Sequence, residues 1–309
     1  MTDFSKTLIR CSTIYNIMGA PEAKTPYQKY LDAKADIEMQ ELNYKVKYID
    51  ENKEHLIPAQ KQKVKIRELK EELLILEAEK DFEILSTGCK THLSSLYAWT
   101  KYHKWSANKD KGNKYTAKGK LAENDSIKLL SETDFIAYNK NEERVDNEYL
   151  TGIPDILLSE DGESISKVID IKTPWDAETF FSNLGKPLNT QYWWQIQGYM
   201  ALTGAILGEV VFCLVNTPES IINKEKYRIA TELDIVTEEN PEYKRKIAEL
   251  INNLTFDDMP TSDRIIRFKV ERDENAIQKV YRKVEKCREY LIEIEKLHLG
   301  ALETENILI

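Results

Sequence analysis

The sequence predicts an α/β fold in which a mixed central sheet is flanked by helices and carries an inserted helical hairpin. Short runs rich in Ile, Leu and Val, separated by turn-forming residues, predict strands between residues 148 and 216. Stretches in which apolar residues recur three and four apart predict helices around them. A long helical stretch at 22–90 interrupts this alternation. We therefore expect it to be an insertion into a core made of residues 1–21 and 91–309.

The composition is that of a globular protein. The 309 residues are 41% hydrophobic and 31% charged, and this length suits about two domains. The sequence has no long uninterrupted apolar run, and its first residues lack the pattern of a signal peptide. We therefore expect a cytoplasmic protein that does not bind a membrane.

Cysteine and histidine usage argues against two kinds of site. None of the cysteines form a C-x-x-C pair, and the histidines are equally scattered: Cys11, Cys89, Cys213, Cys287, His55, His92, His103 and His298. A zinc site or a disulfide framework needs ligands or partners at recognisable spacings. We expect no zinc and four buried free thiols.

The net charge of −9 is unfavourable for nonspecific DNA binding, but one segment is basic. Residues 101–120 hold seven lysines and one aspartate, with aromatic residues between them. Lysines that contact phosphates and aromatics that stack on bases would suit a DNA strand, whereas the alternative is a solvated loop between two helices. The candidate DNA-binding residues are Lys101, Lys104, Trp105, Lys114, Lys118 and Lys120.

The N-terminal third is expected to be helical. Residues 1–19 should hold a short helix, and two long helices at 27–57 and 59–85 should be separated by Pro58. The 3-4 spacing of apolar residues in the second long helix favours an antiparallel hairpin or a short coiled coil. This hairpin either binds a partner or another copy, or only supports the core.

Two more helices should precede the strands, at 89–104 and around 119–130. In the second of them, Glu123 shares one helical face with Ile127 and Leu130. A carboxylate on a buried face is costly unless it is paired or bound to a metal ion. Glu123 is therefore a candidate site residue.

Residues 153–158 and 165–171 are apolar-rich runs on either side of a turn-forming S-E-D-G, and they predict an antiparallel hairpin. Side chains alternate along a strand, so Asp170 and Lys172 should point to the same face. Asp155, at the start of the first run, should lie opposite the Asp170 end. The hairpin is thus expected to gather two carboxylates and one lysine.

Such a cluster suits a hard divalent cation. Mg²⁺ binds through one or two carboxylates, keeps several waters and also takes oxygens from a phosphate substrate. A neighbouring lysine can orient a water or stabilise charge on the attacked phosphate. The alternative is an ordinary surface hairpin with an Asp–Lys pair.

The chain after the hairpin continues the alternation of strands and helices. A helix that presents Gln191, Gln195 and Tyr199 on one face should follow Pro174, so its polar side chains could reach the cluster. Further elements are expected at 208–216 (a central strand), 218–236 (a strand or loop), 241–254 (a helix), 264–270 (a strand) and 273–297 (a long helix).

Five ordered blocks of this chain resemble a known family. They are I-R-C-S-T-I-Y-N-I-M-G, K-G-K-L-A-E-N-D, G-I-P-D, I-D-I-K-T-P and Y-W-W-Q-I-Q-G-Y-M. Together they resemble the lambda-exonuclease or YqaJ-like viral recombinase branch of the PD-(D/E)XK nuclease superfamily. Each block alone is a weak signal, but five in the same order form a specific one.

The resemblance implies roles for individual residues. It makes Asp155 and Asp170 the metal-binding carboxylates, the backbone carbonyl of Ile171 a further ligand, and Lys172 the catalytic lysine. It also makes Glu123 a carboxylate that supports metal binding and Gln195 the glutamine of the following helix.

The resemblance is less complete around the DNA end. Ser12 matches a residue that helps to hold the terminal 5′-phosphate, but the family's arginine is not at its expected spacing, which leaves Lys6 or Arg10 as substitutes. Where the family tends to be basic after the catalytic lysine, the chain has acidic residues, and only Lys186 is within reach.

By this resemblance, the protein would be a Mg²⁺-dependent 5′-to-3′ exonuclease acting on double-stranded DNA ends, with Mn²⁺ as an alternative ion. It would lack the iron–sulfur cluster of some superfamily members, form a trimer, and leave 3′ strands for a single-strand annealing protein in the host cytoplasm. Two alternatives stay open: an endonuclease or repair nuclease of the same superfold, and a noncatalytic DNA-binding or scaffold protein.

Overall fold

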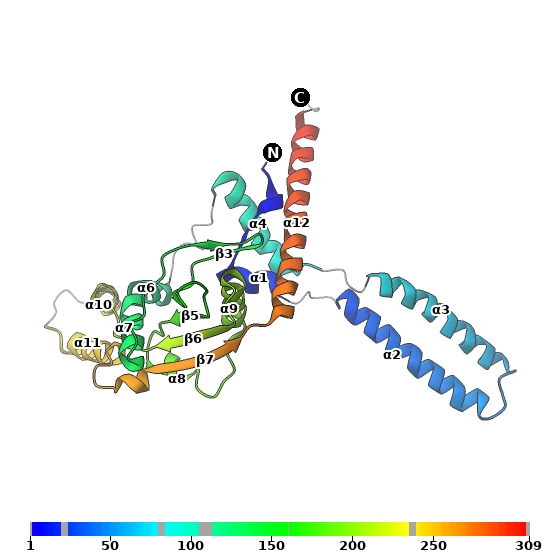
Figure 1. Cartoon of the computed structure of the whole chain (residues 1–309), viewed down its shortest axis with the longest axis horizontal. Coiled ribbons are helices and arrows are strands. Elements are labelled where there is room, and N and C mark those ends of the chain that lie inside the picture. Colours follow the sequence, from blue (N-terminus) through cyan, green and yellow to red (C-terminus); the bar gives the residue numbers. More distant parts are fainter. Residues whose placement is uncertain are drawn as a thin grey trace. The chain divides into compact units, whose positions relative to one another are not determined.

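The computed structural model describes residues 2–19, 24–79, 84–104, 113–159, 161–234 and 239–306 (Figure 1). The chain divides into two compact units, Met1–Tyr15 with Ser95–Val284 and Asn16–Ser94 with Glu285–Ile309. The predicted insertion at 22–90 lies within the second unit, which also takes in neighbouring residues and the end of the chain. Each unit is described by itself.

The first unit is built on a four-stranded mixed sheet of order β4-β5-β6-β7. Its strands are β4 (Ile156–Leu158), β5 (Lys167–Lys172), β6 (Leu207–Cys213) and β7 (Ile265–Glu271). The outer pairs β4–β5 and β6–β7 are antiparallel, whereas β5 and β6 are parallel. This arrangement confirms the predicted hairpin and the predicted mixed sheet.

The central strand β6 is buried along nearly its whole length, as its apolar sequence predicts. The parallel connection from β5 to β6 contains α8 (Ala177–Phe181) and α9 (Thr190–Thr203). Gly208 allows α9 to approach the sheet, because a Cβ atom there would lie 2.6 Å from Cγ1 of Ile196.

The two faces of this sheet are covered by different helices. Helix α7 (Glu123–Asp134) packs on β5 and β6 through a buried core that includes Ile127, Leu130, Ile169 and Val211. Helix α9 also contacts both strands. Because side chains alternate along β5, Ile169 and Ile171 join the core under α7, while Asp170 and Lys172 point to the face that α9 covers.

A second, three-stranded sheet has the order β1-β3-β2. It consists of β1 (Ile9–Arg10), β2 (Val145–Asp146) and β3 (Leu150–Gly152). Strand β1 runs parallel to β3, with Ile9 beside Leu150. This pairing brings the N-terminal segment next to the chain that leads into β4.

One expected element is wrong. Residues 218–236 were expected to form a strand or loop, but helix α10 (Glu219–Glu232) occupies most of this stretch. Ile221, Ile222 and Ile229 recur at helical spacing and are buried. The helix α11 (Pro241–Leu254) begins at its proline, as predicted, and contacts α10.

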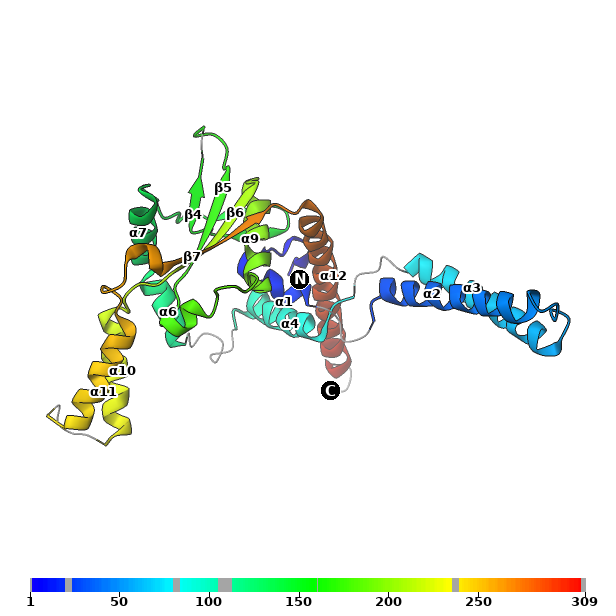
Figure 2. The ribbon, with the colours of Figure 1, turned by 90° about the horizontal axis from the view of Figure 1, so that it is seen from below.

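In the second unit, helices α2 (Pro26–Tyr44) and α3 (Ile57–Glu79) lie side by side, and a π-helical segment η3 (Lys45–Ile49) extends α2 (Figure 2). We call this pair the arm. Its small core consists of Tyr44, Tyr48, Ala59 and Ile66. Pro58 does not separate the helices but lies in the first turn of α3, where its missing N–H group is tolerated.

The remaining elements complete the described chain: η1 (Phe4–Lys6), η2 (Cys11–Thr13), α1 (Ile14–Met18), α4 (Thr87–Tyr102), α6 (Lys114–Leu121), η4 (Thr261–Arg264) and α12 (Glu274–Asn306). All four cysteines are buried free thiols, as expected. No helix among the described residues is both long enough and apolar enough to cross a membrane.

Candidate active site

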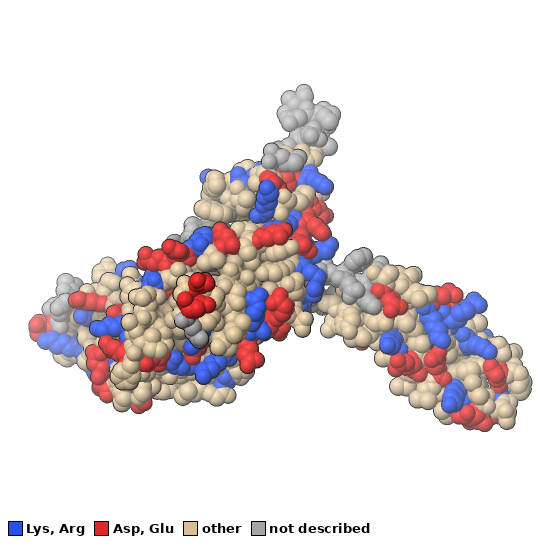
Figure 3. Space-filling view, in the orientation of Figure 1, with Lys and Arg blue, Asp and Glu red and all other residues tan. Residues whose placement is uncertain are grey.

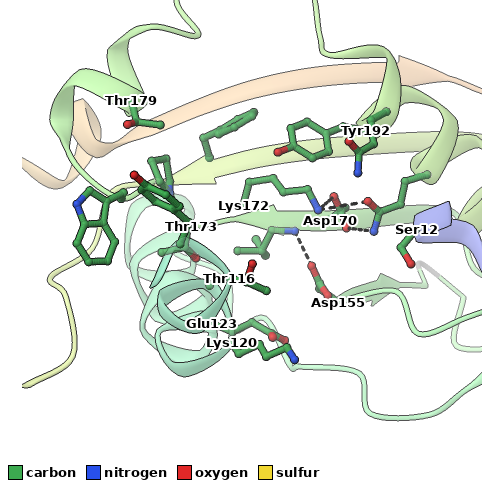
Figure 4. Close-up of a pocket in the computed structure, with 18 residues that line it drawn as sticks. Ser12, Thr116, Lys120, Glu123, Asp155, Asp170, Lys172, Thr173, Thr179 and Tyr192 are labelled. Carbon is green, nitrogen blue, oxygen red and sulfur yellow. Dashed lines mark hydrogen bonds and ion pairs between the residues drawn. The ribbon is translucent and has the colours of Figure 1, made fainter. Parts of the chain in front are cut away.

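Asp155, Asp170 and Lys172 are gathered around one point of a cavity in the first unit (Figure 4). Asp155 immediately precedes β4, while Asp170 and Lys172 lie two residues apart near the end of β5. The hairpin fixes the Asp155 side chain, because the Ile171 N–H group donates a hydrogen bond of 2.6 Å to its Oδ2 atom. The local geometry expected from the sequence is therefore present.

Asp170 is almost completely buried, with 1% of its surface exposed. Its Oδ1 atom accepts a hydrogen bond of 3.1 Å from Nε2 of Gln195, and its Oδ2 atom lies 2.5 Å from Nζ of Lys172. Despite this ion pair, Oδ2 accepts no regular hydrogen bond from the described residues. A buried carboxylate oxygen that has spare capacity to accept is suited to a cation.

Lys172 is held by three neighbours. Its Nζ atom pairs with Asp170, lies 3.5 Å from Oε1 of Gln195, and sits 4.9 Å from the centre of the Tyr192 ring. Burial is the largest single influence on this ammonium group and lowers its pKa, but the charge and hydrogen bond of Asp170 and the charge of Asp155 together outweigh burial and leave the pKa above its ordinary value. Lys172 is thus a fixed positive charge beside the two carboxylates.

The two carboxylates repel each other. Burial raises the pKa of Asp155 well above its ordinary range, and the nearby charge of Asp170 adds to the rise, although the hydrogen bond from Ile171 opposes it. A divalent cation between the carboxylates would remove this cost, because it would favour the ionised form of both.

The cavity has a volume of about 710 Å³ and is lined by polar, basic and aromatic side chains. Its lining includes Ser12, Tyr115, Thr116, Lys120, Glu123, Trp175, Thr179, Gln191 and Tyr192 beside the cluster. Ser12 and Lys120 come from segments far apart in the sequence, so the fold brings together residues that the motif blocks list separately. The cavity is wide enough for a nucleotide-sized group.

Glu123 lines the same cavity but differs from its expected setting. The predicted helix at 119–130 is broken at Ala122, so Glu123 is the first residue of α7; it shares a face with the buried Ile127 and Leu130, but its own side chain is 24% exposed. Its side chain pairs with Nζ of Lys140 at 3.2 Å. No pattern in the sequence indicated that Lys140 pairs with Glu123, because the contact depends on a loop that returns to α7.

The structure separates the predicted DNA-binding lysines into different settings. Lys118 is completely buried, and its Nζ atom donates a hydrogen bond of 2.8 Å to the backbone oxygen of Trp175, so the expectation that it contacts DNA is wrong. Lys114 lies over the Trp175 ring at 4.7 Å and pairs with Glu225. Lys101 donates to the hydroxyl oxygen of Tyr97.

Most of the other predicted DNA-binding residues are exposed at the surface. The exposed residues are Arg10, Ser12, Lys104, Lys120 and Lys186, and of these Ser12 and Lys120 line the cavity. Trp105 lies outside the described residues. The described lysines of the basic segment therefore do not share one setting: Lys118 is buried, whereas Lys104 and Lys120 are exposed.

The cluster holds few potential metal ligands. Among the described residues, no group of three or more His, Cys, Asp or Glu side chains is close enough to form a metal site by itself. The cluster instead offers two carboxylates and the carbonyl of Ile171. Mg²⁺ commonly uses so few protein ligands, because water and substrate phosphate complete its shell. The residues present thus fit Mg²⁺.

No family model and no curated protein sequence matches the chain. Among solved structures, a phage-related exonuclease from Haemophilus somnus 129PT has a TM-score of 0.60 and 21% identity, over 96% of this chain and 99% of that one. An alkaline exonuclease from Laribacter hongkongensis has a TM-score of 0.48 and 17% identity, over 71% of this chain and 88% of that one. The first likeness shows that this chain has the fold of a phage-related exonuclease structure, in agreement with the resemblance found in the sequence.

Proposed function

We propose that the protein is a metal-dependent exonuclease that hydrolyses phosphodiesters at the ends of double-stranded DNA. The observation that carries this proposal is the convergence of Asp155, Asp170 and Lys172 on one cavity. Two carboxylates and a lysine beside a nucleotide-sized cavity suit phosphodiester hydrolysis better than acyl or hydride transfer. The likeness to a phage-related exonuclease supports the same class of reaction.

Asp155, Asp170 and the carbonyl of Ile171 would hold Mg²⁺, or Mn²⁺ in its place, and Glu123 would help if it leaves Lys140. When bound, the ion polarises the phosphate and lowers the pKa of a bound water. The Ile171 N–H group keeps the Asp155 carboxylate pointed toward Asp170. The protein's part is therefore to present two oriented, desolvated carboxylates.

Lys172 would donate to the attacking water or to the phosphate oxygens, where negative charge grows during the reaction. Gln195 contacts both members of the Asp170–Lys172 pair, because its amide nitrogen donates to Asp170 and its oxygen faces Lys172. Tyr199 in turn accepts a hydrogen bond from the same Gln195 amide nitrogen at 3.0 Å. Gln195 is thus a positioning residue that fixes the Asp170–Lys172 pair.

The DNA end would enter beside Ser12 and Lys120, which line the cavity together with the cluster. Ser12 would contact the terminal 5′-phosphate, with Arg10 nearby in the chain, and Lys120 would contact the backbone. Digestion from the 5′ end would leave 3′ single strands for an annealing protein. By the same resemblance the enzyme would work as a trimer in the host cytoplasm.

The deciding experiment is digestion of a linear duplex, labelled separately at its 5′ and 3′ ends, with Mg²⁺, with Mn²⁺ or with a chelator. A relaxed circle is included as a second substrate. We expect metal-dependent release of the 5′ label with the circle intact. Cutting of the circle would instead identify an endonuclease, and the absence of cleavage with either ion would reject the proposed enzyme.

A further inference from the structure

Helix α2 and its extension η3 carry apolar residues on two faces. One face packs on α3 through Ile37, Tyr44 and Tyr48, which are buried. The other face carries Tyr27, Leu31, Met39, Leu42, Val46 and Ile49, which we call the apolar stripe. Within α2, at about 100° per residue, the two faces point roughly 140° apart around the helix. Helix α3 therefore cannot cover the stripe.

The stripe is solvent-exposed along its whole length. Its six side chains have exposed fractions between 44% and 56%. They follow one another at spacings of three or four residues, with the exposed Ala35 filling the one longer gap. Soluble proteins rarely leave a continuous apolar surface of this length uncovered unless another molecule binds it. The spacing is that of a helix seam that packs on a second helix.

The charges of the arm indicate what that molecule is. Residues 24–79 contain 11 Lys and Arg side chains and 12 Asp and Glu side chains. Charges of both signs are mixed over the face of the arm in Figure 3. A surface that binds DNA or an anionic membrane would be basic. A near-neutral, mixed surface around an apolar stripe is instead typical of contact between proteins.

The edge of the stripe carries Glu38 and Lys45, one of each sign and seven residues apart. Both are exposed, and neither forms an ion pair within the described part of the chain. In two antiparallel copies of this helix, Glu38 of one copy lies beside Lys45 of the other, and the same pair forms again on the other side of the two-fold axis. The edge is therefore complementary to itself.

We infer that the apolar stripe binds the same stripe of a second copy of this chain, with the two α2 helices antiparallel. With the two-fold axis between residues 40 and 41, Met39 of one copy packs on Leu42 of the other, and Ala35 packs on Val46. One alignment of the two helices therefore forms both the apolar contacts and the Glu38–Lys45 pairs. This pairing is separate from any contact between the nuclease cores.

The first test is the mass of the full chain in solution, measured by sedimentation equilibrium. Leu42→Glu should halve the mass, because it places one charge from each copy in the contact between the two apolar stripes. Leu42→Gln is a milder second variant in case the first one misfolds. Ile75→Glu is the matched control, because Ile75 lies on α3 and is 63% exposed. An unchanged mass in both Leu42 variants would overturn the inference.

The second test reverses the charges. Glu38→Lys and Lys45→Glu should each weaken self-association by about tenfold, because every pair becomes repulsive. The double variant should restore the wild-type affinity, since it exchanges the partners within each pair. If the two α2 helices were parallel instead, Lys45 would lie close to Asp50 of the other copy, and the double variant would still associate weakly. Failure of this rescue would overturn the antiparallel register.

Discussion

The active-site cavity and the arm depart from the usual distribution of side chains in opposite ways. In the cavity, polar groups such as Asp170 and Gln195 are buried. On the arm, apolar groups such as Met39 and Leu42 are exposed. Each departure costs free energy in the isolated chain, because buried charge loses hydration and exposed hydrocarbon orders water.

The two regions are therefore suited to different ligands. Buried carboxylates with an oxygen atom free to accept suit a cation and a phosphate. The apolar stripe, which is exposed and has helical spacing, suits another apolar surface. Substitutions in each region distinguish a role in binding from a role in stability alone.

Asp170→Asn should lower the cleavage rate by about a thousandfold or more, because it removes one of the two negative charges that would hold the ion. The change keeps the shape of the side chain. Asp258→Asn, at an exposed residue away from the cavity, is the control. The measurements are the rate of release of labelled ends and the binding of Mg²⁺ by calorimetry. Undiminished turnover would show that the buried Asp170 is only structural.

Lys172→Met should lower cleavage by about a hundredfold to a thousandfold while leaving DNA binding in place. Methionine replaces the aliphatic chain but removes the charge beside Asp170. The exposed Lys128→Met is the control on α7. Single-turnover rates and a gel-shift assay measure the two properties separately. A parallel loss of binding and cleavage would mean that Lys172 holds the DNA and does not act in the chemical step.

Within the arm, neighbouring residues should differ sharply in their contribution to stability. Ile66→Ala should lower the free energy of unfolding of the arm by about 2 to 4 kcal/mol, because Ile66 is buried in its small core. Val64→Ala, on the same helix, should change it by less than about 0.5 kcal/mol, because Val64 is exposed. Hydrogen exchange of the arm amides measures both. Equal effects of the two substitutions would show that Ile66 is not part of the core of the arm.

Lys118 should make stability depend on pH. Burial lowers the pKa of this lysine to about 7, so between pH 7 and pH 10.5 the unfolded chain binds a proton that the folded chain does not. The free energy of unfolding should therefore rise with pH. Relative to Lys118→Met, the wild type should gain about 2 kcal/mol from pH 7 to pH 9, as measured by urea unfolding. A constant difference between the two would show that Lys118 stays charged when folded.

Local rules were enough to predict the hairpin and the residues it carries. The strict alternation in I-D-I-K places Asp170 and Lys172 on one face, and the S-E-D-G turn brings Asp155 opposite them. The start of α11 at Pro241 and the mixed sheet followed from similar short-range patterns. The roles assigned to the site residues by resemblance stay predictions.

Other features were decided only by the tertiary structure. Lys118 looked like a surface lysine, but the segment after β5 folds over it and accepts its hydrogen bond through Trp175. Glu123 gained its partner Lys140 from a returning loop, and Ser12 reached the cavity because β1 pairs with β3. The sequence by itself determined which residues could form the cluster, since alternation depends on near neighbours. Burial and long-range pairing depend on segments far away in the chain, so only the folded structure determined what surrounds the cluster.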